Sequence, residues 1–399
     1  MSEQSIIAIE NRYMANVYAR RPVVIVRGKG TIVWDIKGKE YVDCMGGYGV
    51  CLVGHSNPKV VEAVKKQVER LVTFHGSFYN DVRAELLVKL VTIAPKGLDK
   101  VFFSNSGAEA VECAIKLARK HTGKKEVIAM MRGFHGKTMG ALSATWDEKY
   151  RKEFEPLLPG FKHVPYGKLE KVEEAITDQT AAVLVEPVQG EGGIHVPPDD
   201  YLPRLRDLCN DKKVLLIFDE VQAGLGRTGK MFACQHWNVT PDVMCLAKGV
   251  AGGIPMGVTM AREEVMSSFG MGEHTTTLGG NALACAASIA TLDFIINEKL
   301  PEKAATLGKY FKDGLSKLGE KYKIVREARG LGLMLGMELR FECRDVIFKA
   351  LDQGVIILDA GRNVLRFLPP LVIEREQIDR VINVLDKALA EEEHAKIRS

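Results

Sequence analysis

The chain has 399 residues, of which 46% are apolar and 27% are charged, and its formal net charge is +4 at pH 7. This composition is typical of a globular protein and excludes a chain that is disordered throughout, and the length predicts roughly two to three domains. The small charge requires neither nucleic acid nor a membrane as a partner, and no apolar stretch reaches the roughly 18 residues of a membrane span. Because the first residues lack a basic, apolar signal segment, we expect a cytoplasmic protein.

The pattern of strands and helices divides the chain into three parts. Residues 1–50 contain strand-like pieces at 23–27, 31–35 and 40–43. Residues 51–294 alternate helices with apolar strands at 101–104, 126–131, 181–185, 214–218 and 243–247, which predicts a mostly parallel sheet covered on both faces. Residues 295–399 read helix, strand, strand, helix, strand, strand, helix, so we expect a smaller α+β domain that the N-terminal segment joins.

Several familiar site patterns are incomplete. The G-x-G-x-x-G at 224–229 is not followed by a helical period, which disfavours a dinucleotide site. The Gly-Lys-Thr at 136–138 has Met131 where a phosphate-binding P-loop needs glycine, which disfavours ATP. The eight cysteines form no C-x-x-C pair and no zinc spacing occurs, so we expect reduced thiols and no metal.

Three chemically useful side chains follow three of the predicted strands. Glu186 follows the strand at 181–185, Asp219 follows 214–218, and Lys248 follows 243–247. In open α/β sheets, ligands bind outside the carboxyl ends of the strands. We therefore expect two acids and a lysine to meet at one sheet edge.

A helix start near the same edge offers an anion site. Ser106 and Glu109 have the spacing of a capping box, and Gly107 lets a ligand approach the backbone. The free N–H groups and the dipole of such a helix end bind phosphate. A lysine that forms an imine with an aldehyde, an acid that keeps a pyridine nitrogen protonated and a phosphate cradle together predict pyridoxal 5′-phosphate.

From about residue 28 to 373 the sequence resembles the class III (omega-amino-acid) aminotransferases. It is most similar to the acetylornithine and ornithine aminotransferases and to the carrier-protein-dependent aminotransferase of lysine and arginine biosynthesis. The stretches that carry the resemblance are 105–110, 133–136, 186–193, 219–222, 247–249, 277–281 and 365–370. The resemblance implies an aspartate-aminotransferase-like fold of type I. It also implies a large cofactor domain at 51–294, a small domain at 295–399 joined by 1–50, and a homodimer with shared active sites.

The resemblance implies a role for each matching residue. Lys248 would bond the cofactor and carry protons, and Asp219 would pair with the pyridinium nitrogen. The implied cofactor contacts are Ser106, Gly107, Ala108, Phe134, His135, Asp219, Val221, Gln222, Lys248 and, from the neighbouring subunit, Thr277. The implied substrate contacts are Tyr48, Lys137, Glu186, Glu191 and Arg366.

Glu191 and Arg366 would let one site serve two substrates. The α-carboxylate of glutamate needs the arginine, whereas a terminal amine brings no carboxylate to the reacting carbon. Because a bare buried cation is costly, we expect Glu191 to pair with Arg366 during the amine half-reaction.

The sequence departs from the family at two positions. Lys137 stands where the family usually has an arginine that binds the distal carboxylate through two hydrogen bonds, and a lysine cannot copy that fork. Tyr48 matches a tyrosine of ornithine aminotransferases, where acetylornithine enzymes usually have an aliphatic residue. Tyr48 therefore argues against simple acetylornithine as the substrate.

The function that these features favour is transfer of a terminal amino group between an acetylornithine-, ornithine- or lysine-type substrate and 2-oxoglutarate or glutamate, in arginine or lysine biosynthesis. The substrate is free or attached to an acidic amino-group carrier protein. The alternatives are an ornithine or 4-aminobutyrate aminotransferase, an aminomutase or racemase on the same fold, a dinucleotide-dependent oxidoreductase and a non-catalytic scaffold.

Overall fold

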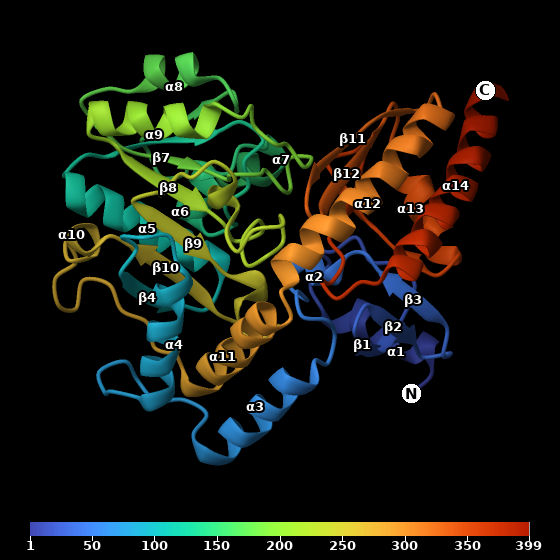
Figure 1. The fold of residues 1–399 in the computed structure, drawn as a ribbon, viewed down its shortest axis with the longest axis horizontal. Helices are drawn as coiled ribbons and strands as arrows, with labels where there is room; N and C mark the ends of the chain where they lie inside the picture. The colour runs from blue at the N-terminus through green and yellow to red at the C-terminus, as the bar shows by residue number, and fades with distance from the viewer. Residues whose placement is uncertain (399) are drawn as a thin grey trace.

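The structure of the protein, a computed structural model, describes residues 1–398. Figure 1 shows two lobes: a larger one built around a central sheet, and a smaller one that holds both ends of the chain. The helix α11 (Ala282–Asn297) belongs to the larger lobe, and α12 (Leu300–Lys321) leads from it into the smaller one. On this basis we propose domain boundaries near residues 50 and 294.

The central sheet has seven strands in the order β4-β10-β9-β8-β7-β5-β6. The strands β9, β8, β7, β5 and β6 run parallel, and β10 runs antiparallel to both of its neighbours. Their bounds are β4 (Lys100–Ser104), β5 (Glu126–Met130), β6 (Phe161–Val164), β7 (Thr180–Val185), β8 (Leu215–Asp219), β9 (Val243–Leu246) and β10 (Gly257–Ala261). The mostly parallel sheet that the sequence predicts is therefore present.

The sheet is buried on both faces. Along β8, Leu216 and Phe218 pack into one core cluster, and Ile217 between them packs into another. The first cluster includes side chains of α9 (Tyr201–Lys212) and α11, and the second includes those of α5 (Gly107–Thr122). Because helices cover both faces of the sheet, its strands need apolar side chains on both sides.

The smaller lobe contains two four-stranded sheets. One has the order β1-β2-β3-β13, and its strands are β1 (Ile25–Lys29), β2 (Ile32–Asp35), β3 (Glu40–Asp43) and β13 (Val355–Ile356). The other has the order β11-β12-β15-β14, and its strands are β11 (Val325–Leu331), β12 (Met334–Leu339), β15 (Val364–Phe367) and β14 (Leu358–Ala360). The N-terminal segment thus joins the small domain through the pairing of β3 with β13.

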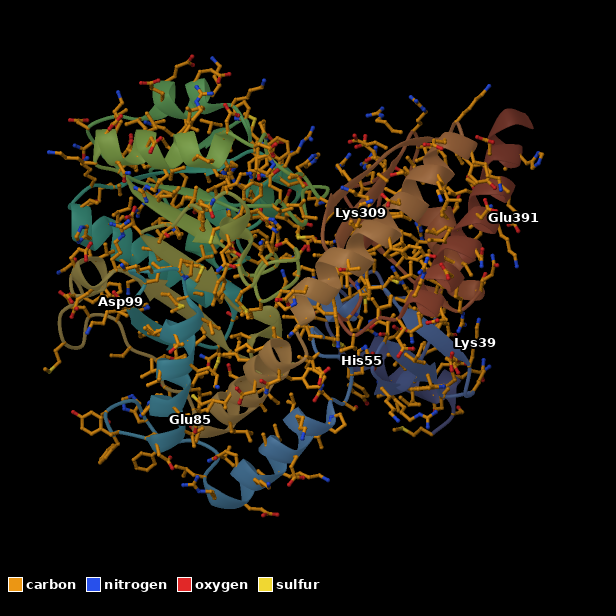
Figure 2. The ribbon with its side chains drawn as sticks, viewed as in Figure 1. Lys39, His55, Glu85, Asp99, Lys309 and Glu391 are labelled. Atoms are coloured by element: carbon orange, nitrogen blue, oxygen red, sulfur yellow. The ribbon has the colours of Figure 1, made fainter. Side chains whose placement is uncertain are left out.

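The remaining helices cover the two lobes and connect them. They are α1 (Glu3–Tyr13), α2 (Gly46–Gly49), α3 (Pro58–Arg70), α4 (Asp81–Ile93), α6 (Met139–Ala144), α7 (Glu148–Arg151), η1 (Lys152–Phe154), α8 (Leu169–Ala175), η2 (Ala233–His236), η3 (Lys248–Ala251), α10 (Glu263–Met266), α13 (Arg344–Asp352) and α14 (Arg375–Arg398). Charged side chains of both signs lie on the surface, as Lys309 on α12 and Glu391 on α14 show in Figure 2. Within the described residues 1–398, no helix is long and apolar enough to cross a membrane.

Candidate active site

Glu186, Asp219 and Lys248 meet at the carboxyl ends of β7, β8 and β9. They line a cavity of about 240 Å³. The other side chains and backbone segments around it are those of Gly107, Ala108, Phe134, His135, Gly136, Glu191, Val221 and Gln222. Because parallel strands end at one edge of a sheet, positions far apart in the sequence are brought together there, as the strand pattern predicts.

Lys248 follows β9 with a left-handed backbone at φ 46°, which is rare for a residue with a side chain. Its amino group is buried, and burial lowers the pKa of the ammonium, although the charges of Glu191 and Asp219 oppose the shift. A lysine whose charged form is disfavoured holds its free amine more readily, and the free amine is the nucleophile.

Asp219 is held by a buried histidine. Nδ1 of His135 lies 2.7 Å from Oδ2 of Asp219, and the backbone N–H of Val221 donates to Oδ1 at 3.0 Å. Burial lowers the pKa of His135, but the hydrogen bond to Asp219 and the charges of Asp219 and Glu186 outweigh it, so the net shift is upward. The imidazole thus fixes the position of the Asp219 carboxylate, which can in turn hold a proton on a ligand ring.

Glu186 is buried at the same edge and organises the backbone around it. Its two carboxyl oxygens accept hydrogen bonds from the N–H groups of Phe134 and Gly190, each at 3.1 Å. Burial raises the pKa of Glu186 to about 7, with His135 acting in the opposite direction. Both backbone bonds connect Glu186 to segments that line the cavity.

The N-terminus of α5 opens toward this cavity. The Ser106 hydroxyl accepts a hydrogen bond from the N–H of Glu109 at 3.2 Å, as a capping box requires. The Glu109 carboxylate in turn accepts the N–H of Asn105, whereas in a regular capping box it would accept the N–H of Ser106. A Cβ on Gly107 would lie 2.8 Å from a methyl group of Val221, so this position requires glycine. The first N–H groups of the helix, the small residues Gly107 and Ala108 and the open cavity in front of them fit a phosphate group.

Arg366 and Glu191 form the ion pair that the sequence predicts. Nη1 and Nη2 of Arg366 lie 2.6 and 3.1 Å from the two carboxyl oxygens of Glu191, and the Arg366 side chain is fully buried. Burial raises the pKa of Glu191, but the charge and hydrogen bonds of Arg366, together with Lys248 and Gln222, outweigh burial and the net shift is downward. The Gln222 amide contacts both partners at 3.4 Å, and the Tyr48 ring lies 5.7 Å from the guanidinium.

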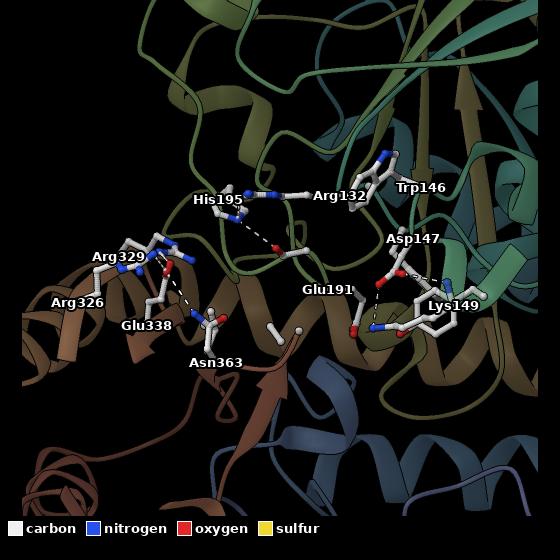
Figure 3. Close-up of a pocket in the computed structure, with 17 residues that line it drawn as sticks. Arg132, Trp146, Asp147, Lys149, Glu191, His195, Arg326, Arg329, Glu338 and Asn363 are labelled. Atoms are coloured by element: carbon white, nitrogen blue, oxygen red, sulfur yellow. Dashed lines mark hydrogen bonds and ion pairs between the residues drawn. The ribbon is translucent and has the colours of Figure 1, made fainter. Parts of the chain in front are cut away.

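A second cavity of about 380 Å³ adjoins the first, because Phe134 and Glu191 line both. Figure 3 shows side chains of the two lobes facing one another across it. The larger lobe contributes Arg132, Trp146, Asp147, Lys149, Tyr150 and His195, and the smaller lobe contributes Arg326, Arg329, Glu338 and Asn363. Four basic side chains therefore line a space directly beside Glu191.

Five of the expected site residues lie outside the lining of the first cavity. Arg366 is fully buried and pairs with Glu191, which does line the cavity. Ser106 caps its own helix, and Tyr48 is half exposed beside Arg366. Lys137 is exposed, with its ammonium 5.0 Å from the centre of the Tyr150 ring. Thr277 is also exposed, in the segment between α10 and α11. A single chain thus brings together the residues expected at the base of the site and leaves those expected at its rim on the surface.

Two features of the site were not predicted from the sequence. The hydrogen bond between His135 and Asp219 joins positions 84 residues apart, and only the histidine of the Phe134-His135-Gly136 motif signals it. Arg329 on β11 contacts the loop that carries Glu191, and no local pattern marks it. The Gly-rich segment at 224–229 forms turns and no α-helix follows it directly, whereas a dinucleotide-binding loop opens a helix.

Known proteins resemble this chain over nearly its whole length. The profile of the family described as "Aminotransferase class-III" matches residues 13–389. The acetylornithine aminotransferase of Methanocaldococcus jannaschii is 49% identical over 397 residues, which cover 98% of this chain and 99% of that protein. The acetylornithine aminotransferase of Methanopyrus kandleri is 50% identical over 381 residues, which cover 95% of this chain and 97% of that protein.

Solved structures agree with this assignment. An ornithine aminotransferase of Toxoplasma gondii superimposes with a TM-score of 0.95 at 36% identity and covers 99% of this chain and 96% of its own. An acetylornithine aminotransferase of Elizabethkingia anophelis gives a TM-score of 0.87 at 35% identity and covers 98% of this chain and 100% of its own. The fold is therefore that of the type I pyridoxal-phosphate enzymes. The chain belongs to the class III aminotransferases and is an aminotransferase that depends on pyridoxal 5′-phosphate.

Proposed function

We propose that the protein transfers the terminal amino group of an acetylornithine-type substrate to 2-oxoglutarate, in arginine biosynthesis. The observation that carries the proposal is the buried ion pair of Arg366 and Glu191 beside Lys248. A terminal amine reacts at a carbon without a carboxylate, and Glu191 then neutralises Arg366. Glutamate brings its own α-carboxylate, which replaces Glu191 on the guanidinium. One site thus accepts two unlike amines in turn.

The residues at the base of the site have separate tasks in this reaction. Pyridoxal 5′-phosphate, when bound, supplies the electron sink that the reaction needs. Gly107 and Ala108 hold its phosphate, and Asp219, oriented by His135, keeps the ring nitrogen protonated. Val221 and Phe134 enclose the ring. Lys248 uses its Nζ atom to take a proton from one carbon and return it to the next.

The amine substrate has room for a substituent at its far end. The second cavity begins at Glu191 and Phe134, and it accommodates the α-amino, α-carboxylate and acyl groups of such a substrate. Its lining has four arginine and lysine side chains beside the carboxylates of Asp147, Glu191 and Glu338. Arg132 is the cation among them that forms no ion pair with these acids in the described residues, and it suits a carboxylate of the substrate or of an acidic amino-group carrier protein. Free ornithine is the second candidate, because Tyr48 matches a tyrosine that the resemblance gives to the ornithine enzymes. The 49% and 50% identity to acetylornithine aminotransferases outweighs this single position in the proposal. The proposed location is the cytoplasm.

We further propose that two copies of the chain form a homodimer with shared active sites. Apolar side chains of the segment between α3 and α4 are exposed, among them Leu71, Phe74, Phe78 and Tyr79. Thr277 and Leu278 are exposed on a separate segment, and Thr277 reaches the phosphate of the neighbouring subunit in this arrangement.

Half-reactions followed by cofactor absorbance test the proposal. The purified holoenzyme is mixed with N-acetylornithine, ornithine, 4-aminobutyrate or a carrier-linked amine, each without an acceptor. We expect N-acetylornithine to convert the cofactor to its amine form fastest and 2-oxoglutarate to reverse the change. An enzyme that reacts with glutamate and with none of these terminal amines would contradict the proposed substrate class.

A further inference from the structure

The loop that carries Glu191 has a strained backbone. After β7 the chain turns at Gly190, and a bridge between Gln189 and His195 closes the loop. Within it, Ile194 has a left-handed backbone at φ 57°. A β-branched residue rarely adopts that conformation, and it persists only where surrounding contacts impose it.

Arg329 of the small domain supplies such contacts. Its Nε donates to the carbonyl oxygens of Gly193 and Ile194, each at 3.0 Å, and its Nη2 donates to Gly193 at 2.7 Å. Nη1 donates to Glu338 on β12 at 2.6 Å, and Arg329 and Glu338 lie side by side in Figure 3. Glu338 therefore fixes the guanidinium of Arg329 on the sheet, and the guanidinium holds the loop through hydrogen bonds to its backbone.

The two arginines that hold this loop lie in one row of the sheet. Arg329 on β11 is directly opposite Gly336 on β12, and Gly336 is directly opposite Arg366 on β15. Residues directly opposite one another in antiparallel strands share a face. A Cβ on Gly336 would lie 3.1 Å from Cβ of Ile194, so Ile194 sits over the middle of the row. Arg329 contacts the loop at one end of the row, and Arg366 binds Glu191 at the other.

We propose that Arg329 is a positioning residue for Glu191. It fixes the backbone at 193–194 so that the Glu191 carboxylate returns to Arg366 whenever the substrate brings no carboxylate of its own. This inference rests on the proposed function, in which Arg366 exchanges Glu191 for the α-carboxylate of glutamate. The small domain thereby sets how strongly the site favours a terminal amine over glutamate.

Arg329→Gln separates the two half-reactions. A carboxamide cannot reproduce the three donated bonds, so Glu191 leaves Arg366 more easily. We expect KM for the terminal amine to rise about tenfold and KM for glutamate to fall about threefold to tenfold, because glutamate must displace Glu191 from Arg366. Arg340→Gln is the matched control, since Arg340 belongs to the same lobe, donates to the carbonyl oxygen of Lys323 and lines neither cavity.

A double-variant comparison shows whether Arg329 acts through Glu191. In a Glu191→Gln background, adding Arg329→Gln should cause no further change in the kinetics of either half-reaction. The double variant should therefore react like Glu191→Gln alone. Additive losses in the double variant would overturn the proposal. So would an equal loss of both half-reactions in Arg329→Gln, accompanied by loss of bound cofactor, because that is the result of a general structural defect.

Glutarate binding gives a readout that does not depend on the amine substrate. Glutarate has the two carboxylates of glutamate without its amine, so it binds by displacing Glu191 from Arg366. Measured by the absorbance shift of the holoenzyme, Arg329→Gln should bind glutarate about threefold to tenfold more tightly than the wild type or Arg340→Gln. Unchanged affinity would overturn the role of Arg329. Tighter binding in an enzyme that accepts no terminal amine would support Arg329 and reject the proposed substrate instead.

Discussion

Nδ1 of His135 lies 2.7 Å from Oδ2 of Asp219, and both side chains are buried where the central sheet ends. Against the effect of burial, the hydrogen bond to Asp219 and its charge raise the pKa of His135. In the proposed function the ring nitrogen of the cofactor would be a second partner of the same carboxylate. Asp219 would then lie between the histidine and the cofactor.

Replacing His135 by phenylalanine should destabilise the apoenzyme more than the holoenzyme. The change leaves the buried carboxylate of Asp219 without its histidine partner, which costs roughly 3 kcal/mol. Bound cofactor restores one partner and so reduces the loss. Urea unfolding of both forms measures the difference. Equal destabilisation of apoenzyme and holoenzyme would show that the histidine fills space and does little for the carboxylate.

Lys248→Ala should abolish turnover and leave the cofactor bound without a covalent bond. We expect a rate loss on the order of 10⁴-fold, because the variant lacks both the nucleophile and the proton carrier. Borohydride reduction and peptide mass mapping should find the adduct on Lys248 in the wild type and on no lysine of the variant. Lys137→Ala, which changes an exposed lysine, is the control that should retain the adduct on Lys248.

Lys137→Arg should improve the use of acetylornithine. The resemblance places a carboxylate-binding arginine at this position, and a guanidinium offers two parallel hydrogen bonds where an ammonium offers a point charge. We expect KM for N-acetylornithine to fall about threefold to tenfold, with KM for glutamate unchanged. Lys149→Arg is the comparison, since Lys149 lines the second cavity and also contacts the Tyr150 ring. Improvement in Lys149→Arg alone would show that Lys149, and not Lys137, lies next to the carboxylate of the substrate.

His195 should make stability depend on pH below neutrality. Burial, followed by the charges of Arg329 and Arg132, lowers the pKa of His195 to about 4. The unfolded chain has the ordinary pKa of about 6.5 and binds the proton first, so the stability present above pH 6.5 is lost as the pH falls toward 4. Relative to His195→Gln, the wild type should lose about 2 kcal/mol between pH 7.5 and 4 after allowance for solvent screening. Parallel unfolding free energies of the two proteins across this range would contradict the shift.

The base of the site could be predicted because each residue follows a strong local signal. Asp219 and Lys248 come directly after apolar strands, and Gly107 starts a capped helix, so sheet topology alone brings them together. The cofactor followed from that set of residues. The family resemblance added Glu191 and Arg366, which are 175 residues apart and carry no shared local pattern.

The features that escaped prediction depend on tertiary packing. The strand β10 at Gly257–Ala261 follows the Gly252-Gly253 turn as a short apolar run, and its antiparallel direction is set by its neighbours β4 and β9. The strand β6 at Phe161–Val164 mixes polar and apolar residues because it lies at the sheet edge. Arg329 is one of many basic residues in the sequence, and only the docking of the loop at 190–195 onto β11 distinguishes it.

The parallel pairing of β3 with β13 joins residues 42–43 to residues 355–356. During synthesis the first three strands therefore leave the ribosome with an open edge, and that edge stays unpaired until more than three hundred further residues have followed. The unpaired edge of a strand can form hydrogen bonds with strands of other chains, which leads to aggregation. Contacts between residues this distant in the sequence also slow folding. The nascent chain should consequently depend on chaperone protection of its N-terminal hairpins, and detaching the first fifty residues should harm the yield of folded protein more than it harms the finished cofactor site.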